Sequence, residues 1–193
     1  MHYRIYFHLF IFILIVFQAR AQSDFLYEPS ASHPYGLPNP NAPENIKDWE
    51  ELIGECECES FTFQKDRTWS EPVKAIWRFK YIMNGTAVQD ESLKSDGIHA
   101  GSIRQFDSEG ASWNVHYYSA SAAPQDLQSW NGKRDGDKIE LYNEQKAPNG
   151  MDGFYKIAFT DISRQGFNWL GQWVSPDESI KFPLWKINCI KTK

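Results

Sequence analysis

Apolar and polar residues alternate along most of the chain after residue 54, as they do in β-strands that bury one face. The clearest case is the stretch 73–83, in which Trp77, Phe79 and Tyr81 share one face while Arg78 falls on the other. The same alternation, bounded by turn residues, predicts strands at 55–63, 73–83, 87–94, 99–107, 112–120, 127–133, 138–143, 154–162, 167–174 and 180–190. Segments of this kind at this spacing indicate an all-β fold.

Short connections rich in glycine separate the expected strands. Asn84-Gly85 is a strong signal for a two-residue hairpin turn. Strands joined in this way pair with their neighbours in an antiparallel meander. About 8–10 strands are too many for one open sheet, so we expect an antiparallel up-and-down barrel. Two longer connections, at 121–126 and 144–153, leave a two-sheet sandwich as the alternative.

A short N-terminal helix is expected ahead of the first strand. Residues 41–44 offer a helix cap, an early proline and an acid for the first turn. Ile46, Trp49 and Leu52 then form one apolar stripe at helical spacing, and Gly54 ends the segment. Together with the Pro-rich residues ahead of it, this helix would close or brace one end of the barrel.

The first 45 residues differ in composition from the rest. Residues 1–21 combine a weakly basic start, an apolar run at 5–17 and the small-x-small pattern Ala19-Arg20-Ala21, which is the order of a cleavable signal peptide. Residues 22–45 hold five prolines and are interpreted as a Pro-rich flexible lead-in. The barrel domain is then expected at 46–193. The mature chain should be secreted or periplasmic, with no membrane anchor.

Composition narrows the classes of partner. The chain has 193 residues, 41% of them hydrophobic and 16% aromatic, which suits one domain with a real core. Its 20 basic and 25 acidic residues give a net charge of -5, and the signal carries two of the arginines and no acid. An acidic domain without a basic stripe is poorly suited to nucleic acid or to an anionic membrane surface. Neither is expected as a partner.

Three cysteines, Cys56, Cys58 and Cys189, predict one disulfide and one spare thiol in an oxidising compartment. Cys56 and Cys58 share a strand face, where a bridge between them is geometrically awkward. Cys189 is the better partner for either one, and such a bond would tie the first strand to the last. The three thiols could also bind zinc, but no fourth ligand lies nearby in the sequence, so no metal is expected.

Eight tryptophans are the most unusual feature of the composition. Inside a small barrel such side chains fill the core or line a pocket that opens at the mouth, whereas on an outer face they stack on sugars. We expect most of them in the core. The candidates for the barrel interior, and so for ligand binding, are Trp77, Phe79, Tyr81, Trp113, Tyr117, Trp169 and Trp173.

The sequence shows no familiar catalytic motif: the patterns G-x-S-x-G, H-E-x-x-H and the phosphate-binding P-loop are absent. His99 and His116 lie on expected strands, and either could act as an acid–base group beside a carboxylate. A hydrogen-bonded or exposed histidine is the simpler interpretation. Asp90-Glu91 and Asp177-Glu178 are interpreted as turn or edge residues. No catalytic residue and no cofactor is assigned.

Several stretches resemble a known group of proteins. They are SIRQFD at 102–107, WNVHYYS at 113–119, WNG at 130–132, FNW at 167–169, Ser175, Asp177 and Trp185. These stretches resemble uncharacterised bacterial lipocalin-like proteins of the calycin β-barrel superfamily, over about residues 49–190. The first strand departs from that group, because such barrels often have Gly-x-Trp where this chain has Gly54-Glu55-Cys56. Haem-binding relatives use a histidine on a late strand, and none follows His116 here.

The sequence therefore predicts a secreted, lipocalin-like barrel that binds a small hydrophobic or amphipathic molecule. One alternative is a carbohydrate-binding β-sandwich that exposes flat tryptophan faces. A second is a barrel enzyme that uses His99 or His116 with a carboxylate at the cavity rim. The exposure of the tryptophans tests the first alternative, and the position of the histidines tests the second.

Overall fold

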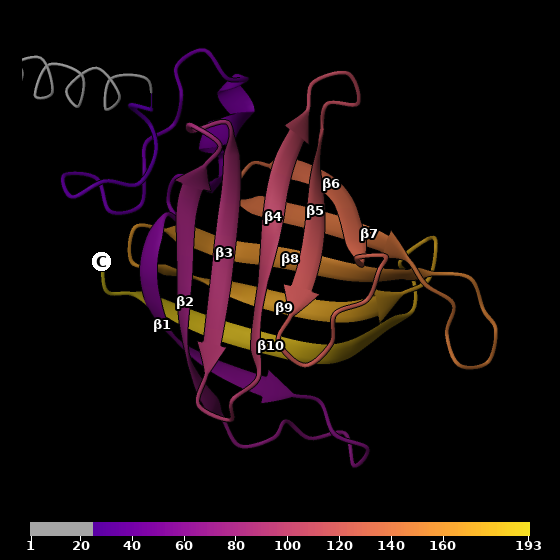
Figure 1. The fold of residues 1–193 in the computed structure, drawn as a ribbon. Coiled ribbons are helices and arrows are strands. Elements are labelled where there is room, and N and C mark those ends of the chain that lie inside the picture. The colour runs from indigo at the N-terminus through magenta and orange to yellow at the C-terminus, as the bar shows by residue number, and fades with distance from the viewer. Residues whose placement is uncertain (1–24) are drawn as a thin grey trace, which may run out of the picture.

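Residues 25–193 are described in the computed structural model, and the predicted signal peptide at 1–21 lies outside them. Ten antiparallel strands form a closed barrel in which β1 also pairs with β10 (Figure 1). The strands are β1 (Gly54–Thr62), β2 (Val73–Ile82), β3 (Ala87–Lys94), β4 (His99–Asp107), β5 (Ser112–Ser119), β6 (Ser129–Asp135), β7 (Lys138–Glu144), β8 (Phe154–Ser163), β9 (Gly166–Val174) and β10 (Lys181–Lys191). The predicted all-β, up-and-down barrel is confirmed, and the sandwich alternative is wrong.

The barrel has two different ends. In Figure 1, β2 to β5 stand upright in front while β7 to β10 run across behind them. Because the chain runs up and down, alternate connections lie at the same end of the barrel. The connections after β2, β4, β6 and β8 are short turns, and we call their end the closed end. The connections after β1, β3, β5, β7 and β9 include the longest loops, and we call their end the open end.

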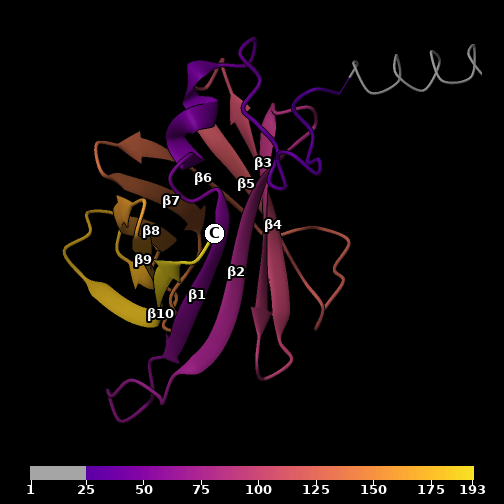
Figure 2. The ribbon, with the colours of Figure 1, turned by 90° about the vertical axis from the view of Figure 1, so that its left-hand side faces the viewer.

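The predicted helix is present only as a 3-10 turn, η1 (Glu44–Trp49), which lies over the closed end (Figure 2). A segment of this length has little helical stability of its own, so packing holds it in place. Trp49 is fully buried, and its ring meets those of Trp113 and Phe159 edge-on, with centroids 5.7 and 5.2 Å away. The turn thus closes the barrel through one large side chain.

Polar contacts fix η1 to the strands below it. Trp113 Nε1 donates to Asp48 Oδ2 at 2.9 Å. Arg134, on β6, donates to the carbonyl oxygen of Asp48 at 2.6 Å and to Glu51 Oε2 at 2.9 Å. The hydrogen bond from Arg134 lowers the pKa of Glu51. These contacts hold the residues on either side of Trp49 against β5 and β6.

Part of the predicted lead-in also lies on the closed end. Residues 25–43 form no helix or strand. The N–H of Tyr27 donates to Asn84 Oδ1 at 3.1 Å, and the N–H of Tyr81 donates to the carbonyl oxygen of Tyr35 at 2.8 Å. The segment is therefore attached to β2 and to the turn that follows it.

A disulfide crosses the seam between β1 and β10. Cys58 and Cys189 are opposed in the strand register, their Cα atoms lie 4.2 Å apart, and their sulfurs are bonded. Cys56 faces the same interior, remains a thiol and is buried, and this burial raises its pKa to about 11. The prediction of one disulfide and one spare thiol is confirmed, with Cys58 as the partner of Cys189.

Replacing Cys58 and Cys189 together by alanine should lower the free energy of unfolding by about 2–5 kcal/mol, because the bond closes a long loop. Urea denaturation followed by tryptophan fluorescence measures this change. Cys56→Ala is the control, since it leaves the bond intact and should cost only about 1 kcal/mol. A double variant as stable as the unmodified chain would contradict a stabilising role for the bond at the seam.

Candidate functional site

A buried ion pair divides the barrel interior. Arg104 Nη1, from β4, donates to Asp90 Oδ2 on β3, and Trp77 Nε1 donates to Asp90 Oδ1 at 2.7 Å. The side chains of Arg104 and Asp90 are 2% and 3% exposed. The guanidinium carbon lies 4.5 Å from the ring centroid of Trp49 and 5.1 Å from that of Phe79. Pairing, hydrogen bonding and aromatic contact together make the burial of these two charges tolerable.

The prediction that Asp90 lies at a turn or edge is wrong. Asp90 lies in the middle of β3, on the inward face that also carries Val88 and Ser92. An acid at such a position needs a buried cation, and Arg104 provides it. Asp177-Glu178 does lie in a turn as predicted, between β9 and β10.

A cavity of about 210 Å³ lies in the interior between this ion pair and the open end. Most of its wall is apolar or aromatic. The aromatic lining comprises Trp77, Tyr117, Trp130, Tyr155, Phe159, Trp169 and Trp185. The polar side chains of the lining are those of Asp90, Ser92, Lys94, Ser102, Arg104 and Gln128. Ile98 and Gln128 come from two connections of the open end, so the cavity reaches that end of the barrel.

Larger depressions of about 380, 540 and 650 Å³ lie on the outer surface. Charged residues contribute to the lining of all three, and the C-terminal residues Lys191 and Lys193 contribute to the one of about 540 Å³. The interior cavity is smaller, but the barrel wall surrounds it and aromatic rings line it. Since small-molecule sites are enclosed and mostly apolar with few polar groups, the interior cavity is the better candidate.

The seven predicted interior residues separate into three groups. Those that line the cavity are Trp77, Tyr117 and Trp169. Those that are buried in the packed core on the closed-end side are Phe79, Tyr81 and Trp113. Trp173 is half-buried near the end of β9 and lies outside the lining, with its Nε1 donating to the carbonyl oxygen of Gln145 at 2.9 Å.

The seven interior candidates leave out several residues of the cavity. Trp130, Tyr155 and Trp185 line it from β6, β8 and β10. Their inward direction follows from strand alternation, because Tyr155 shares a face with Ile157 and Trp185 with Ile187. Strand alternation in β6, β8 and β10 therefore indicates, from the sequence, that these three side chains face inward.

The two histidines lie outside the cavity. His116 is on the outer face of β5, and its Nδ1 lies 2.7 Å from Ser129 Oγ. His99 is exposed at the start of β4. Neither has a carboxylate partner among residues 25–193, so the structure brings together no histidine–carboxylate pair at the rim.

The tryptophans offer no platform for sugars. Five of the eight are buried, and the remaining three are half-buried. Stacking on a sugar requires flat rings that face solvent. The exposure that the carbohydrate-binding alternative requires is therefore not present.

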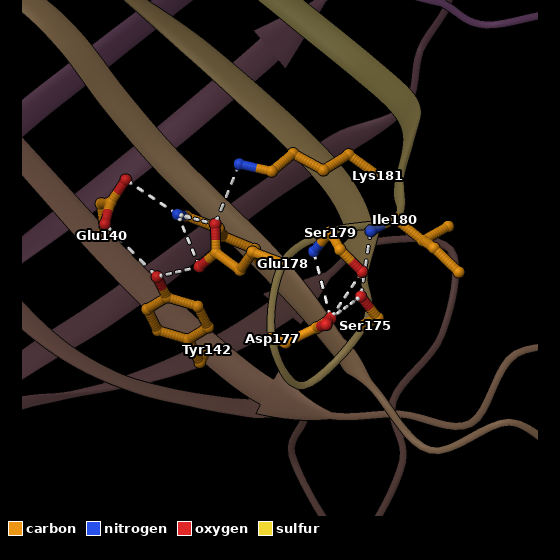
Figure 3. A network of polar contacts seen from close by, with 9 residues as sticks. Glu140, Tyr142, Ser175, Asp177, Glu178, Ser179, Ile180 and Lys181 are labelled. Carbon is orange, nitrogen blue, oxygen red and sulfur yellow. Dashed lines mark hydrogen bonds and ion pairs between the residues drawn. The ribbon is translucent and has the colours of Figure 1, made fainter.

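A polar cluster fastens the β9–β10 connection to the outside of β7 and β8 (Figure 3). Lys156 on β8 is 6% exposed and pairs with Glu140 and Glu178, each at 2.9 Å. Tyr142 donates to Glu178 Oε1 at 2.7 Å, and Lys181 reaches Glu178 Oε2 at 3.1 Å. Burial alone would raise the pKa of Glu178, but these hydrogen bonds outweigh it and lower that pKa to about 2. Because its charged groups are paired, we interpret the cluster as a structural clasp.

The structure offers no arrangement for a bound metal ion in the part of the chain that it describes. No group of three or more His, Cys, Asp or Glu side chains is placed to hold one within residues 25–193.

Over the same residues, no helix is long and apolar enough to span a membrane.

Asp90→Asn should lower the free energy of unfolding at neutral pH by about 3–5 kcal/mol, because it leaves the Arg104 charge buried without its partner. The double variant Asp90→Asn with Arg104→Met should lose much less free energy of unfolding than the sum of the losses in the two single variants. Urea denaturation of the two single variants and the double variant measures this coupling. Additive effects would contradict the dependence of each charge on the other.

Because of the clasp, the free energy of unfolding should fall at acidic pH. The pKa of Glu178 falls from an ordinary 4.5 to about 2 on folding, so its contribution is present above the unfolded pKa and is lost as the pH falls toward about 2. Glu178→Gln should reduce this loss, and at neutral pH it should lower stability by roughly 1–2 kcal/mol.

Urea midpoints measured from neutral pH, through the ordinary carboxyl pKa of 4.5 and down toward about pH 2, give both the acid-dependent loss and the change in stability at neutral pH. Glu144→Gln is the control, because Glu144 is an exposed acid on the neighbouring β7. A Glu178→Gln profile that runs parallel to that of the unmodified chain would argue against the clasp.

Comparison with known proteins gives little sequence similarity. No protein-family model and no curated protein sequence matches the chain. One solved structure with some likeness is the crystal structure of Rv2717c from M. tuberculosis, at 10% identity and a TM-score of 0.49, with 79% of this chain and 100% of that chain covered. Independently of that likeness, the closed ten-stranded antiparallel barrel fits a calycin-like fold.

Proposed function

We propose that the chain is a secreted binding protein that holds a small, partly apolar molecule inside its barrel, like the lipocalin-like proteins that its sequence resembles. The observation that carries this proposal is the interior cavity of about 210 Å³. Aromatic rings dominate its wall, and a few polar side chains interrupt it. This combination is typical of small-molecule sites.

The cavity limits the size of the ligand. Drug-sized ligands occupy pockets of about 300–1,000 Å³, whereas a cavity of about 150 Å³ holds benzene. At about 210 Å³ the site suits a molecule with one substituted ring or a short alkyl chain. A ligand with roughly ten non-hydrogen atoms can reach micromolar affinity within the usual limit per atom.

Access is expected from the open end. Trp49 and the ion pair of Asp90 and Arg104 fill the closed end of the interior. The other end is bordered by Ile98, which is 47% exposed, and by Gln128. A ligand would therefore enter between the β3–β4 and β5–β6 connections.

The secreted location rests on the predicted signal peptide at 1–21. The disulfide between Cys58 and Cys189 is compatible with an oxidising compartment outside the cytoplasm.

Filling the cavity should abolish binding. Ala100 lines the cavity from β4, so Ala100→Phe places a ring in the ligand's volume. The probes are phenol, benzyl alcohol, benzoate and benzylamine, titrated while tryptophan fluorescence is followed. At least one should give a saturable change in the unmodified chain, and Ala100→Phe should weaken it by at least about tenfold.

Ile103→Phe is the matched control, since residue 103 lies on the outer face of the same strand, and it should bind as the unmodified chain does. Thermal unfolding checks that both variants fold. No saturable binding of any probe, or equal binding by Ala100→Phe, would contradict a ligand site inside the barrel.

A further inference from the structure

The charges that line the cavity do not cancel. Its charged lining residues are Asp90, Arg104 and Lys94. Asp90 is satisfied by Arg104 and by Trp77 Nε1, so it offers no free carboxylate to a ligand. Lys94 is left as the net charge of the lining.

Lys94 lies at the open-end side of the cavity and is mostly shielded from solvent. Its side chain is 11% exposed, and its ammonium lies 5.0 Å from the ring centroid of Trp185. Its ammonium forms an ion pair at 3.3 Å with Asp96, which is 31% exposed and does not line the cavity. Asp96 also accepts the N–H of Ile98 at 3.0 Å. Lys94 thus keeps hydrogen-bonding capacity toward the cavity, because an ammonium has three donors.

Further donors in the wall lack acceptors. The indole N–H groups of Trp77, Trp130 and Trp185 are all used within the protein. Trp169 Nε1 and the Tyr155 hydroxyl have no such partner among residues 25–193. Burial raises the pKa of Tyr155 to about 12, so its hydroxyl keeps its proton at neutral pH and can donate.

The side chains that carry these donors lie along one connected part of the wall. The ring of Trp185, which Lys94 overlies, meets the ring of Trp169 with centroids 5.3 Å apart. The Tyr155 hydroxyl and the Trp169 ring both lie against Gly171, where an added Cβ would come within 2.4 Å and 2.7 Å of them. The glycine therefore gives the phenol its place beside the indole.

We propose that the ligand is a small carboxylate, with a ring or short alkyl chain among the aromatic side chains and its carboxylate facing Lys94. This inference rests on the proposed function, since it names the class of ligand for the same cavity. An ammonium ligand would meet Lys94 and find no free carboxylate, because Asp90 is already paired. A neutral ligand would leave the lysine charge shielded without a new partner. A phosphate would normally require more donors or an arginine fork.

The test compares each acid with its uncharged amide: benzoate with benzamide, phenylacetate with phenylacetamide, and hexanoate with hexanamide. Binding is measured by isothermal titration calorimetry at neutral pH and low salt, on the mature full-length chain. Each favoured carboxylate should bind at least about tenfold more tightly than its amide. Lys94→Met, which keeps the apolar stem and removes the charge, should bring the two affinities close together without weakening the amides.

Lys74→Met is the matched control, because Lys74 is an exposed lysine on the outer face of β2, and it should keep the preference. Lys94→Gln provides a second variant if Lys94→Met fails to fold. Equal binding of acids and amides by the unmodified chain would overturn the inference and leave the binding function standing. A preference that survives both substitutions of Lys94 would overturn the role of that lysine, and absence of binding by every probe would overturn both proposals.

Discussion

The ion pair between Asp90 and Arg104 is the interaction on which the interior of this barrel depends. Asp90 accepts both the Arg104 guanidinium and the indole N–H of Trp77, so it positions a strand residue from β2 as well as one from β4. Arg104 in turn presents its flat cation to Trp49. Through these contacts one carboxylate links the strands to the 3-10 turn that closes the barrel, and separates a packed half from a hollow one.

As a consequence, the two ends of the barrel differ in how their interiors are filled. Short turns and η1 let large side chains fill the closed half completely. Longer connections at the other end leave room above the ion pair, and aromatic rings border that room instead of filling it. The clasp around Lys156 holds the β9–β10 connection down from outside, with its charges directed at one another and away from the cavity. The charge that remains within the lining is that of Lys94.

Much of the fold could be predicted from the sequence because strand alternation is a local signal. All ten strands were predicted close to their observed positions, and Asn84-Gly85 does lie in the turn between β2 and β3. The expected helix is only a 3-10 turn, because its stripe of apolar residues reflects the packing of Trp49 and not helical stability. The choice between Cys56 and Cys58 could not be made, because both face inward and only the register of β1 on β10 selects Cys58.

The site was harder to predict than the fold. Trp77, Tyr117 and Trp169, three of the candidates, line the cavity, but the boundary between the filled and hollow halves of the barrel depends on contacts between distant strands. Asp90 was misplaced because an acid in a polar stretch usually indicates the surface. Its burial requires Arg104, and pairing between residues on different strands is not visible in a local pattern. Lys94 was missed because a charged residue at the end of a strand usually lies at the surface, although it shares the inward face of β3 with Asp90 and Ser92.

The most direct test of the binding site is a crystal structure of residues 22–193 soaked with 4-iodobenzoate, in which anomalous scattering locates the iodine. We expect an iodine peak inside the barrel among Trp77, Trp169 and Trp185, with the carboxylate directed at Lys94. An interior without a peak, because side chains have collapsed into the cavity, would contradict it. So would a ligand found only on the outer surface.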